Sequence, residues 1–124
     1  MSDRLAILVW AATPERPDLV VTPLVHALAA RALDAEVEVH FAGPAVRWLV
    51  DGVAAQAWPT PGREKSIAEF IQELLAADVR CYACGMARAA WVAAEDVLLP
   101  GTGAAGATAF VARVLDPAWQ TQVY

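Results

Sequence analysis

The chain has 124 residues, of which 58% are hydrophobic and 19% charged, with 9 Lys+Arg, 14 Asp+Glu and 2 Cys. This length and apolar content fit a single domain over residues 1–124 and exclude an intrinsically disordered chain. Two cysteines exclude a disulfide-stapled scaffold, and a net charge of −5 argues against nucleic acid and anionic membranes as partners. Because the charges are few for this size, we expect another subunit to cover part of the surface.

The first apolar run, residues 5–12, predicts a buried strand over residues 5–10. It is too short to span a membrane, and it has neither the basic start nor the small-residue cleavage site of a signal peptide. We therefore expect a cytoplasmic protein with free thiols and no membrane partner.

The rest of the chain alternates between helical and strand patterns. In chain order, these patterns predict a helix over 19–33, a strand over 36–42, a short helix over 44–50, a helix over 66–77, a strand over 79–83, a short helix over 85–92, a strand over 97–99, a turn over 100–103, a helix over 104–115 with Phe110, Val111 and Val114 inward, and a strand over 121–124. Such alternation predicts an open α/β sheet with helices on both faces. Functional loops then lie at the carboxyl ends of the strands.

Cys81 and Cys84 form a CxxC pattern at the end of the strand predicted over 79–83. Side chains three residues apart on a strand point to opposite faces, with their Cα atoms on the order of 10 Å apart. A disulfide needs a Cα separation of roughly 4.4–6.8 Å. We therefore predict two free thiols, with Cys81 serving as a small buried apolar residue.

Cys84 has two interpretations. It falls at the carboxyl end of a strand and at the start of a helix, where unpaired amides and the helix dipole favour an anion. Arg88 follows one turn later, and both features would favour a reactive thiolate. The alternative is a second buried and unreactive thiol.

Gly101, Gly103 and Gly106 match the pattern G-x-G-x-x-G. A dinucleotide site also needs an acidic residue about 20 positions further on, and residues 120–124 contain none. The pattern therefore favours a tight turn with close helix packing, and no nucleotide cofactor is expected. A third interpretation stays open, in which backbone amides of this run line a small anion or sulfur pocket beside Cys84.

The remaining candidate residues carry weaker signals. His26 is expected to be packed or interfacial, and His40, on the polar face of its strand, is expected to be solvated or interfacial. Two Cys and two His at these spacings do not form a zinc signature, so no metal site is predicted. Trp10 and Trp91 are expected in the core or an interface, with the wall of a pocket as the alternative.

Four segments together show a family likeness: residues 5–14, residues 37–43 with Val46 and Leu49 after them, residues 79–86, and residues 103–115 with the closing residues 119–124. The most specific is the strand end with Ala83 and Cys84, followed by Gly85 and Met86. In these segments the chain resembles the DsrE/DsrF-like family of small sulfur-relay proteins, which also contains relatives of unknown role. The resemblance covers nearly the whole chain.

The resemblance implies a three-layer α/β/α fold of flavodoxin-like appearance, with a mostly parallel sheet of about five strands. It also implies homotrimers or hexamers, and it matches Cys84 to the sulfur-carrying cysteine of the family. The candidate binding residues around Cys84 are Gly85, Met86, Arg88, Gly101 and Gly103.

Two functional hypotheses follow. The first is a small sulfur-handling protein that carries or transfers sulfur as a persulfide on Cys84, without a cofactor and with sulfur donor and acceptor proteins as partners. The second is a non-catalytic oligomeric protein, with a ligand-binding or structural role, in which Cys84 is unreactive. A thiol peroxidase is disfavoured because Cys81 is badly aimed to act as a resolving thiol. Whether the chain is an enzyme stays open.

Overall fold

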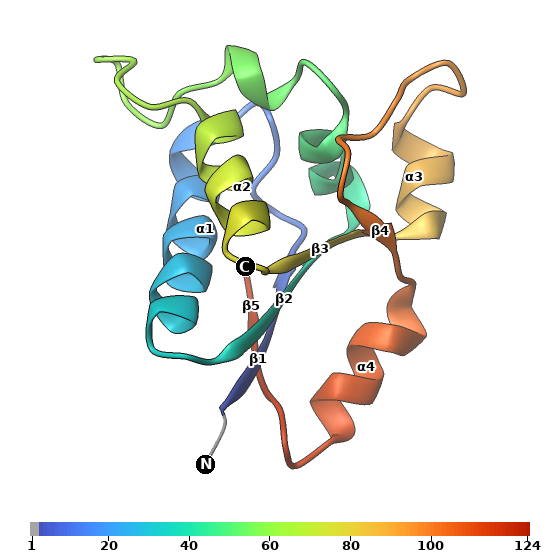
Figure 1. Cartoon of the computed structure of the whole chain (residues 1–124). Coiled ribbons are helices and arrows are strands. Elements are labelled where there is room, and N and C mark those ends of the chain that lie inside the picture. The colour runs from blue at the N-terminus through green and yellow to red at the C-terminus, as the bar shows by residue number, and fades with distance from the viewer. Residues whose placement is uncertain (1–2) are drawn as a thin grey trace.

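The computed structural model describes residues 3–124 and contains one five-stranded sheet. Its strands are β1 (Arg4–Val9), β2 (Glu36–Phe41), β3 (Arg80–Ala83), β4 (Gly103–Ala104) and β5 (Gln120–Val123). They lie in the order β4-β3-β2-β1-β5, and every neighbouring pair is parallel (Figure 1). The predicted α/β fold with a parallel sheet is confirmed.

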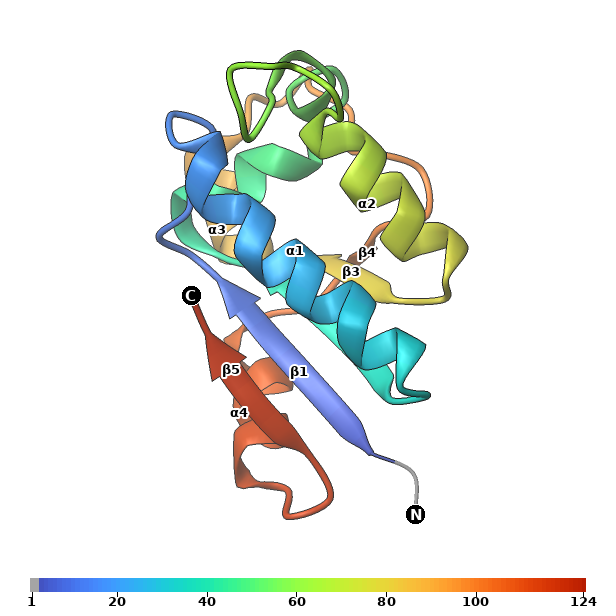
Figure 2. The ribbon, with the colours of Figure 1, turned by 90° about the vertical axis from the view of Figure 1, so that its left-hand side faces the viewer.

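Helices cover both faces of this sheet. They are α1 (Pro17–Ala32), α2 (Ile67–Ala76), α3 (Gly85–Trp91) and α4 (Ala107–Leu115), with the 3-10 helices η1 (Gly43–Leu49) and η2 (Ala54–Gln56) between β2 and α2. Figure 2 shows α1 and α2 in front of the sheet and α4 behind it. The chain steps in one direction from β1 to β4 and then returns to β5, so right-handed crossovers place α4 on the opposite face.

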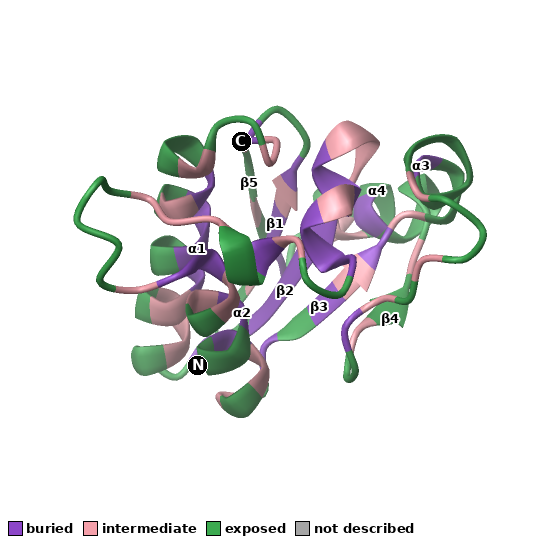
Figure 3. Cartoon of the chain, turned by 90° about the horizontal axis from the view of Figure 1, so that it is seen from above, coloured by how far each residue is buried: buried purple, intermediate pink, exposed green. Residues whose placement is uncertain are grey.

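The main core lies between the sheet and the layer of α1 and α2. Alternate strand residues point into it, including Val39, Phe41 and Cys81, and all three are buried. Trp48 of η1 is also fully buried, and its indole N–H donates a hydrogen bond of 2.7 Å to the carbonyl oxygen of Ala12. Figure 3 shows this core as a band of buried strands and inner helix faces. Apolar burial here is the main stabilising contribution to the fold.

The opposite face of the sheet is covered by α4 and is partly polar. Ala6, Phe110 and Trp119 form a small buried cluster there. Glu38 and His40 of β2 point to the same face and are buried as well. This polar patch beneath a helix is the part of the fold that positions the candidate site.

Some predicted elements differ from the observed ones. Residues 97–99 do not form a strand of the sheet, and Leu98 makes only an isolated antiparallel bridge to Val50. The fourth strand is instead β4, which spans the end of the predicted turn and the first residue of the predicted helix, because the chain pairs with β3 only after turning at Gly101; the helix itself begins at Ala107. The short helix predicted over 44–50 is a 3-10 helix.

Helix α4 also differs from its prediction. Phe110 is buried, but Val111 and Val114 are about half exposed, so the expectation that all three point inward is wrong. The reason is that α4 lies alone on its face of the sheet, without the second helix that flanks α1 on the other face. Its outer apolar residues therefore remain uncovered.

Candidate functional site

A small pocket of about 180 Å³ opens at the carboxyl ends of the strands, between the sheet and the first turns of α4. Its lining residues are Leu8, His40, Ala42, Cys84, Ala105, Gly106, Ala107, Phe110 and Val111. Most of these side chains are aliphatic or aromatic. The Cys84 thiol and the His40 ring are the two that bring reactive or polar chemistry to the pocket.

Cys84 directly precedes α3 and is fixed by its backbone, whose N–H donates to the carbonyl oxygen of Phe41 at 3.0 Å. It is partly exposed, whereas Cys81 is buried in the core on the other face of the sheet. Burial raises the pKa of Cys81 to about 12. Cys81 lies in the core and Cys84 lines the pocket on the other face of the sheet, as strand alternation predicts, and both thiols are free.

His40 lies in a different environment from the one that its strand position predicts. It is only 4% exposed, so the expectation of a solvated histidine is wrong, because α4 covers the polar face of β2. Its ring packs against Tyr82 at 5.1 Å and edge-on against Phe110 at 5.4 Å between centroids. Burial lowers the pKa of His40, and the neighbouring Glu38 carboxylate offsets only part of that effect.

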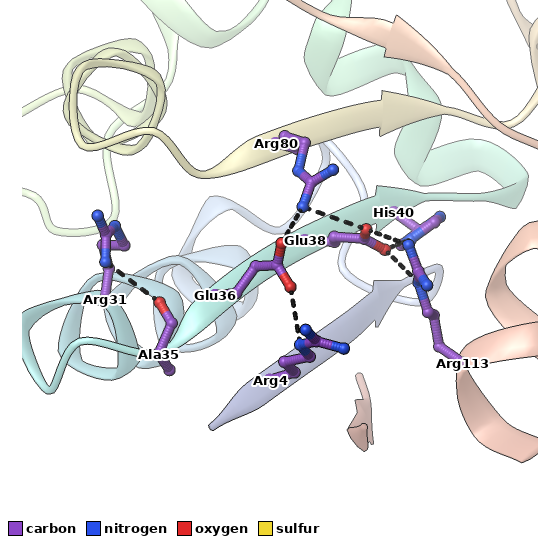
Figure 4. A network of polar contacts seen from close by, with 8 residues as sticks. All are labelled: Arg4, Arg31, Ala35, Glu36, Glu38, His40, Arg80 and Arg113. Carbon is purple, nitrogen blue, oxygen red and sulfur yellow. Dashed lines mark hydrogen bonds and ion pairs between the residues drawn. The ribbon is translucent and has the colours of Figure 1, made fainter. Parts of the chain in front are cut away.

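Glu38 connects His40 to α4 (Figure 4). Its carboxylate lies 3.1 Å from Nε2 of His40 and accepts hydrogen bonds of 3.1 and 2.8 Å from Arg113. Burial tends to raise the pKa of Glu38, but the hydrogen bonds from Arg113 and His40 outweigh it and hold the pKa below its ordinary value. Arg80 of β3 adds a weaker contact at 3.9 Å. The buried carboxylate is therefore ionised and held by charged partners.

This pairing determines the tautomer of His40. A carboxylate is an acceptor only, so the neutral ring donates its Nε2–H to Glu38 and keeps a lone pair on Nδ1. That Nδ1 is buried and has no hydrogen-bond partner in the part of the chain that the structure describes. The sequence signal for this pair was available, since Glu38 and His40 are two positions apart and share one face of a strand.

The predicted binding residues lie in several places. Gly85 begins α3, Met86 is 82% exposed, and Arg88 lines a separate shallow depression together with Gly85. Gly101, with a φ of +86°, lies against Leu75, and Gly103 lies against the ring of Tyr82. Their binding roles stay predictions.

The third glycine of the run is the one that reaches the pocket. Gly106 directly precedes α4 and lines the pocket beside Ala105 and Ala107. The Ala105 N–H donates to the carbonyl oxygen of Ala83, which holds this segment next to the end of β3. The interpretation that the run borders a pocket beside Cys84 therefore has a geometric basis at Gly106.

Other residues singled out in the sequence lie outside this pocket. His26 is exposed, and its Nδ1 pairs with the hydroxyl of Tyr124. Trp10 and Trp91 are about half exposed, and the Arg47 guanidinium lies 5.7 Å from the Trp91 ring centroid.

Within residues 3–124, no three His, Cys, Asp or Glu side chains gather closely enough to hold a metal ion. Across the same residues, no helix combines the length and the apolar character needed to cross a bilayer.

Comparison with solved structures finds several similar folds, including the two that follow. The YchN protein of Escherichia coli has a TM-score of 0.77 and 15% identity, with complete coverage of both chains. MTH1491 of Methanobacterium thermoautotrophicum, a protein of unknown function, has a TM-score of 0.67 and 20% identity, covering 99% of this chain and 100% of its own. At these identities the similarity shows the fold alone.

Sequence comparison identifies the family. No curated protein matches the chain. The model of the DsrE/DsrF-like family matches residues 6–119. The chain therefore belongs to the DsrE/DsrF-like family.

Proposed function

We propose that this protein carries sulfur as a persulfide on Cys84. The observation that carries the proposal is the contrast between its two thiols. Cys84 lines a small pocket at the sheet edge, whereas Cys81 is buried in the core behind the sheet. Membership in a family linked to sulfur relay supports this role for the accessible thiol.

The transfer needs no net oxidation or reduction. The Cys84 thiolate attacks the outer sulfur of a donor persulfide, R–S–SH, so that a new S–S bond forms at Cys84 while the donor's S–S bond breaks. The donor leaves as a thiol after taking up a proton. An acceptor thiolate then attacks the outer sulfur on Cys84 and restores the free thiol.

The surroundings of Cys84 suit such a carrier. Gly106 and Ala107, at the start of α4, line the same pocket. The first amides of a helix have no partners within the helix and favour a nearby anion, such as a thiolate or an ionised persulfide. The apolar walls limit the access of water to the bound sulfur.

We also propose that the protein acts in the cytoplasm as a homo-oligomer, a trimer or a hexamer. A reducing compartment keeps carrier thiols free. On α4, the exposed residues Val111, Val114 and Leu115 form an apolar stripe at helical spacing. A second copy of the chain is the partner proposed for this stripe, and sulfur donor and acceptor proteins are the proposed partners of Cys84.

Intact mass spectrometry tests the proposed carrier role. After incubation with a small persulfide donor and removal of excess reagent, the wild-type protein should gain the mass of one sulfur atom. The Cys84→Ser variant should gain nothing, and the matched variant Cys81→Ser should behave as the wild type. An unmodified wild-type protein would favour the alternative of a non-catalytic ligand-binding or structural protein.

A further inference from the structure

We infer that His40, oriented by Glu38, is the proton acceptor for small thiols that enter the Cys84 pocket. This inference deepens the proposed function and rests on it for its biological meaning. It assigns a role to a buried histidine that sulfur transfer on Cys84 alone does not require. It also assigns a ligand class to the pocket, namely a small uncharged thiol.

The sheet register places His40 and Cys84 on the same face. His40 pairs with Tyr82, and Cys84 follows two residues later along the neighbouring strand. With about 4.8 Å between strands and 3.3 Å per residue, their Cα atoms are roughly 8 Å apart. Both residues line the same pocket, so a small group that enters the pocket lies next to both.

The second feature is the unpaired ring nitrogen. His40 Nε2 donates to Glu38, and the Glu38 carboxylate is held by Arg113, so Nδ1 is left as an acceptor without a partner among residues 3–124. A buried acceptor without a hydrogen-bond partner is energetically unfavourable. A ligand that donates a hydrogen bond to Nδ1 would relieve this penalty.

The neighbours of the ring are compatible with a neutral base. Leu8 of β1 and Phe110 of α4 are apolar. The polar and charged groups of this sheet face are Glu38 on β2, Arg80 and Tyr82 on β3, Arg113 on α4, and Cys84 itself. Burial lowers the pKa of His40, so the ring can accept a proton at neutral pH.

The step balances in atoms and electrons. An acceptor thiol R–SH gives its proton to Nδ1 of His40, and its sulfur attacks the outer sulfur held on Cys84. The R–S–S bond forms while the bond to the Cys84 Sγ breaks. His40 then returns the proton to the departing Cys84 thiolate. The pocket volume, about 180 Å³, is below the 300–1,000 Å³ of sites for drug-sized ligands, which restricts the entering group to a small one.

The test uses a disulfide in place of a persulfide, so it works even if the carrier proposal fails. In the Cys81→Ser variant, Cys84 is converted to its S-methyl disulfide with methyl methanethiosulfonate. Release of the methylthio group by ethanethiol is then followed against pH. The His40→Gln substitution should slow release at neutral pH by on the order of 10²-fold, the scale of general base catalysis. The difference should shrink at alkaline pH, where the thiol ionises without a base.

The matched control is His26→Gln, since His26 is exposed and lies outside the pocket lining. It should release the methylthio group at the same rate as the Cys81→Ser protein with both histidines intact. If a folded His40→Gln variant releases the methylthio group as fast as the protein that retains His40 across the pH range, the inference is overturned. So would failure of the reagent to label Cys84, because the pocket would then be closed to small thiols.

A second measurement keeps the inference testable if His40→Gln does not fold. The chain has two histidines, so His26→Gln leaves His40 as the only one. Nitrogen-15 NMR of this variant should show a neutral ring protonated at Nε2, and ethanethiol should shift the Nδ1 resonance towards that of a hydrogen-bonded nitrogen. A ring protonated at Nδ1 would contradict the proposed role. So would an Nδ1 resonance that does not shift when ethanethiol is added.

Discussion

Arg113 on α4 donates two hydrogen bonds, of 3.1 and 2.8 Å, to the carboxylate of Glu38 on β2, across 75 positions of sequence. The pair ties α4 to the polar face of the sheet, on the same helix as the pocket residues Ala107 and Phe110. It also fixes the carboxylate that orients His40. One ion pair thus links the stability of the fold to the geometry of the candidate site.

The first prediction concerns this ion pair. The Arg113→Gln substitution should lower the free energy of unfolding by about 2 kcal/mol, because it removes two charge-assisted hydrogen bonds from a buried carboxylate. Urea unfolding measures this loss. The control Arg4→Gln removes an exposed pair with Glu36, makes no contact with Glu38 and should cost less than about 1 kcal/mol. Equal losses of unfolding free energy in the two variants would show that the Arg113 pair stabilises the fold no more than an exposed ion pair does.

The second prediction concerns pH. The pKa of His40 lies below its ordinary value of 6.5, chiefly because of burial. As the pH falls below 6.5, the unfolded chain therefore takes up a proton that the folded protein resists, and stability decreases. The pKa of Glu38 is also lowered, so its stabilising contribution is present above 4.5 and is lost on further acidification.

Urea unfolding between pH 7 and pH 5 measures the contribution of His40 to stability separately from that of Glu38, which is lost only at lower pH. The His40→Gln variant should show a smaller loss of stability over this range than the wild type. An unchanged pH dependence in that variant would mean that His40 is not held neutral by the fold.

The third prediction concerns the two thiols. A small neutral alkylating reagent at pH 8 should modify Cys84 and leave Cys81 unmodified, because Cys81 is buried and its pKa is raised to about 12. Mass spectrometry should show one modification in the wild type, one in Cys81→Ser and none in Cys84→Ser. Modification of both cysteines in the folded protein would contradict the structural separation of the pair.

The fourth prediction concerns the pocket. The Ala107→Leu substitution places a larger side chain on the lining and should slow alkylation of Cys84 by filling the space in front of it. The control Ala109→Leu changes an exposed position of the same helix that is not part of the lining. It should leave the alkylation rate unchanged. Equal rates for the two variants would argue that the reagent reaches Cys84 by another route.

The fifth prediction concerns the outer face of α4. Leu115→Glu changes a residue of the apolar stripe that is 77% exposed, and it should shift the protein towards smaller species in sedimentation velocity. Leu33→Glu is the control, because Leu33 is 79% exposed but lies just after α1, outside the stripe. A wild-type protein that is monomeric at all concentrations would rule out the proposed oligomer.

Much of the fold follows from local sequence patterns. The continuous apolar run that includes Val9 predicts strand β1, and the alternation around Val39 predicts strand β2. The amphipathic pattern after Ser66 predicts helix α2. Helix α2 even carries its own start signal, since Ser66 and Glu69 form a reciprocal capping box. Patterns of this kind are local, so the sequence alone reveals them.

The missed features depend on contacts between distant segments. His40 looks solvent-facing in its own strand, and only the packing of α4, some 70 positions later, buries it. The short strand β4 exists because Ala83 and Ala104 pair, which no local pattern encodes. The place of Cys84 at the end of a strand and the shared strand face of Glu38 and His40 were predictable, whereas the burial of Glu38 and His40 required the fold.

The central claim is that Cys84 holds transferable sulfur. The most direct measurement is the intact mass of the single-cysteine variant Cys81→Ser, first after loading with a persulfide donor and again after addition of a small acceptor thiol. The mass should increase by one sulfur atom in the first spectrum and return to the unloaded value in the second. A mass that never changes, or a gain that Cys84→Ser shows equally, would contradict this claim.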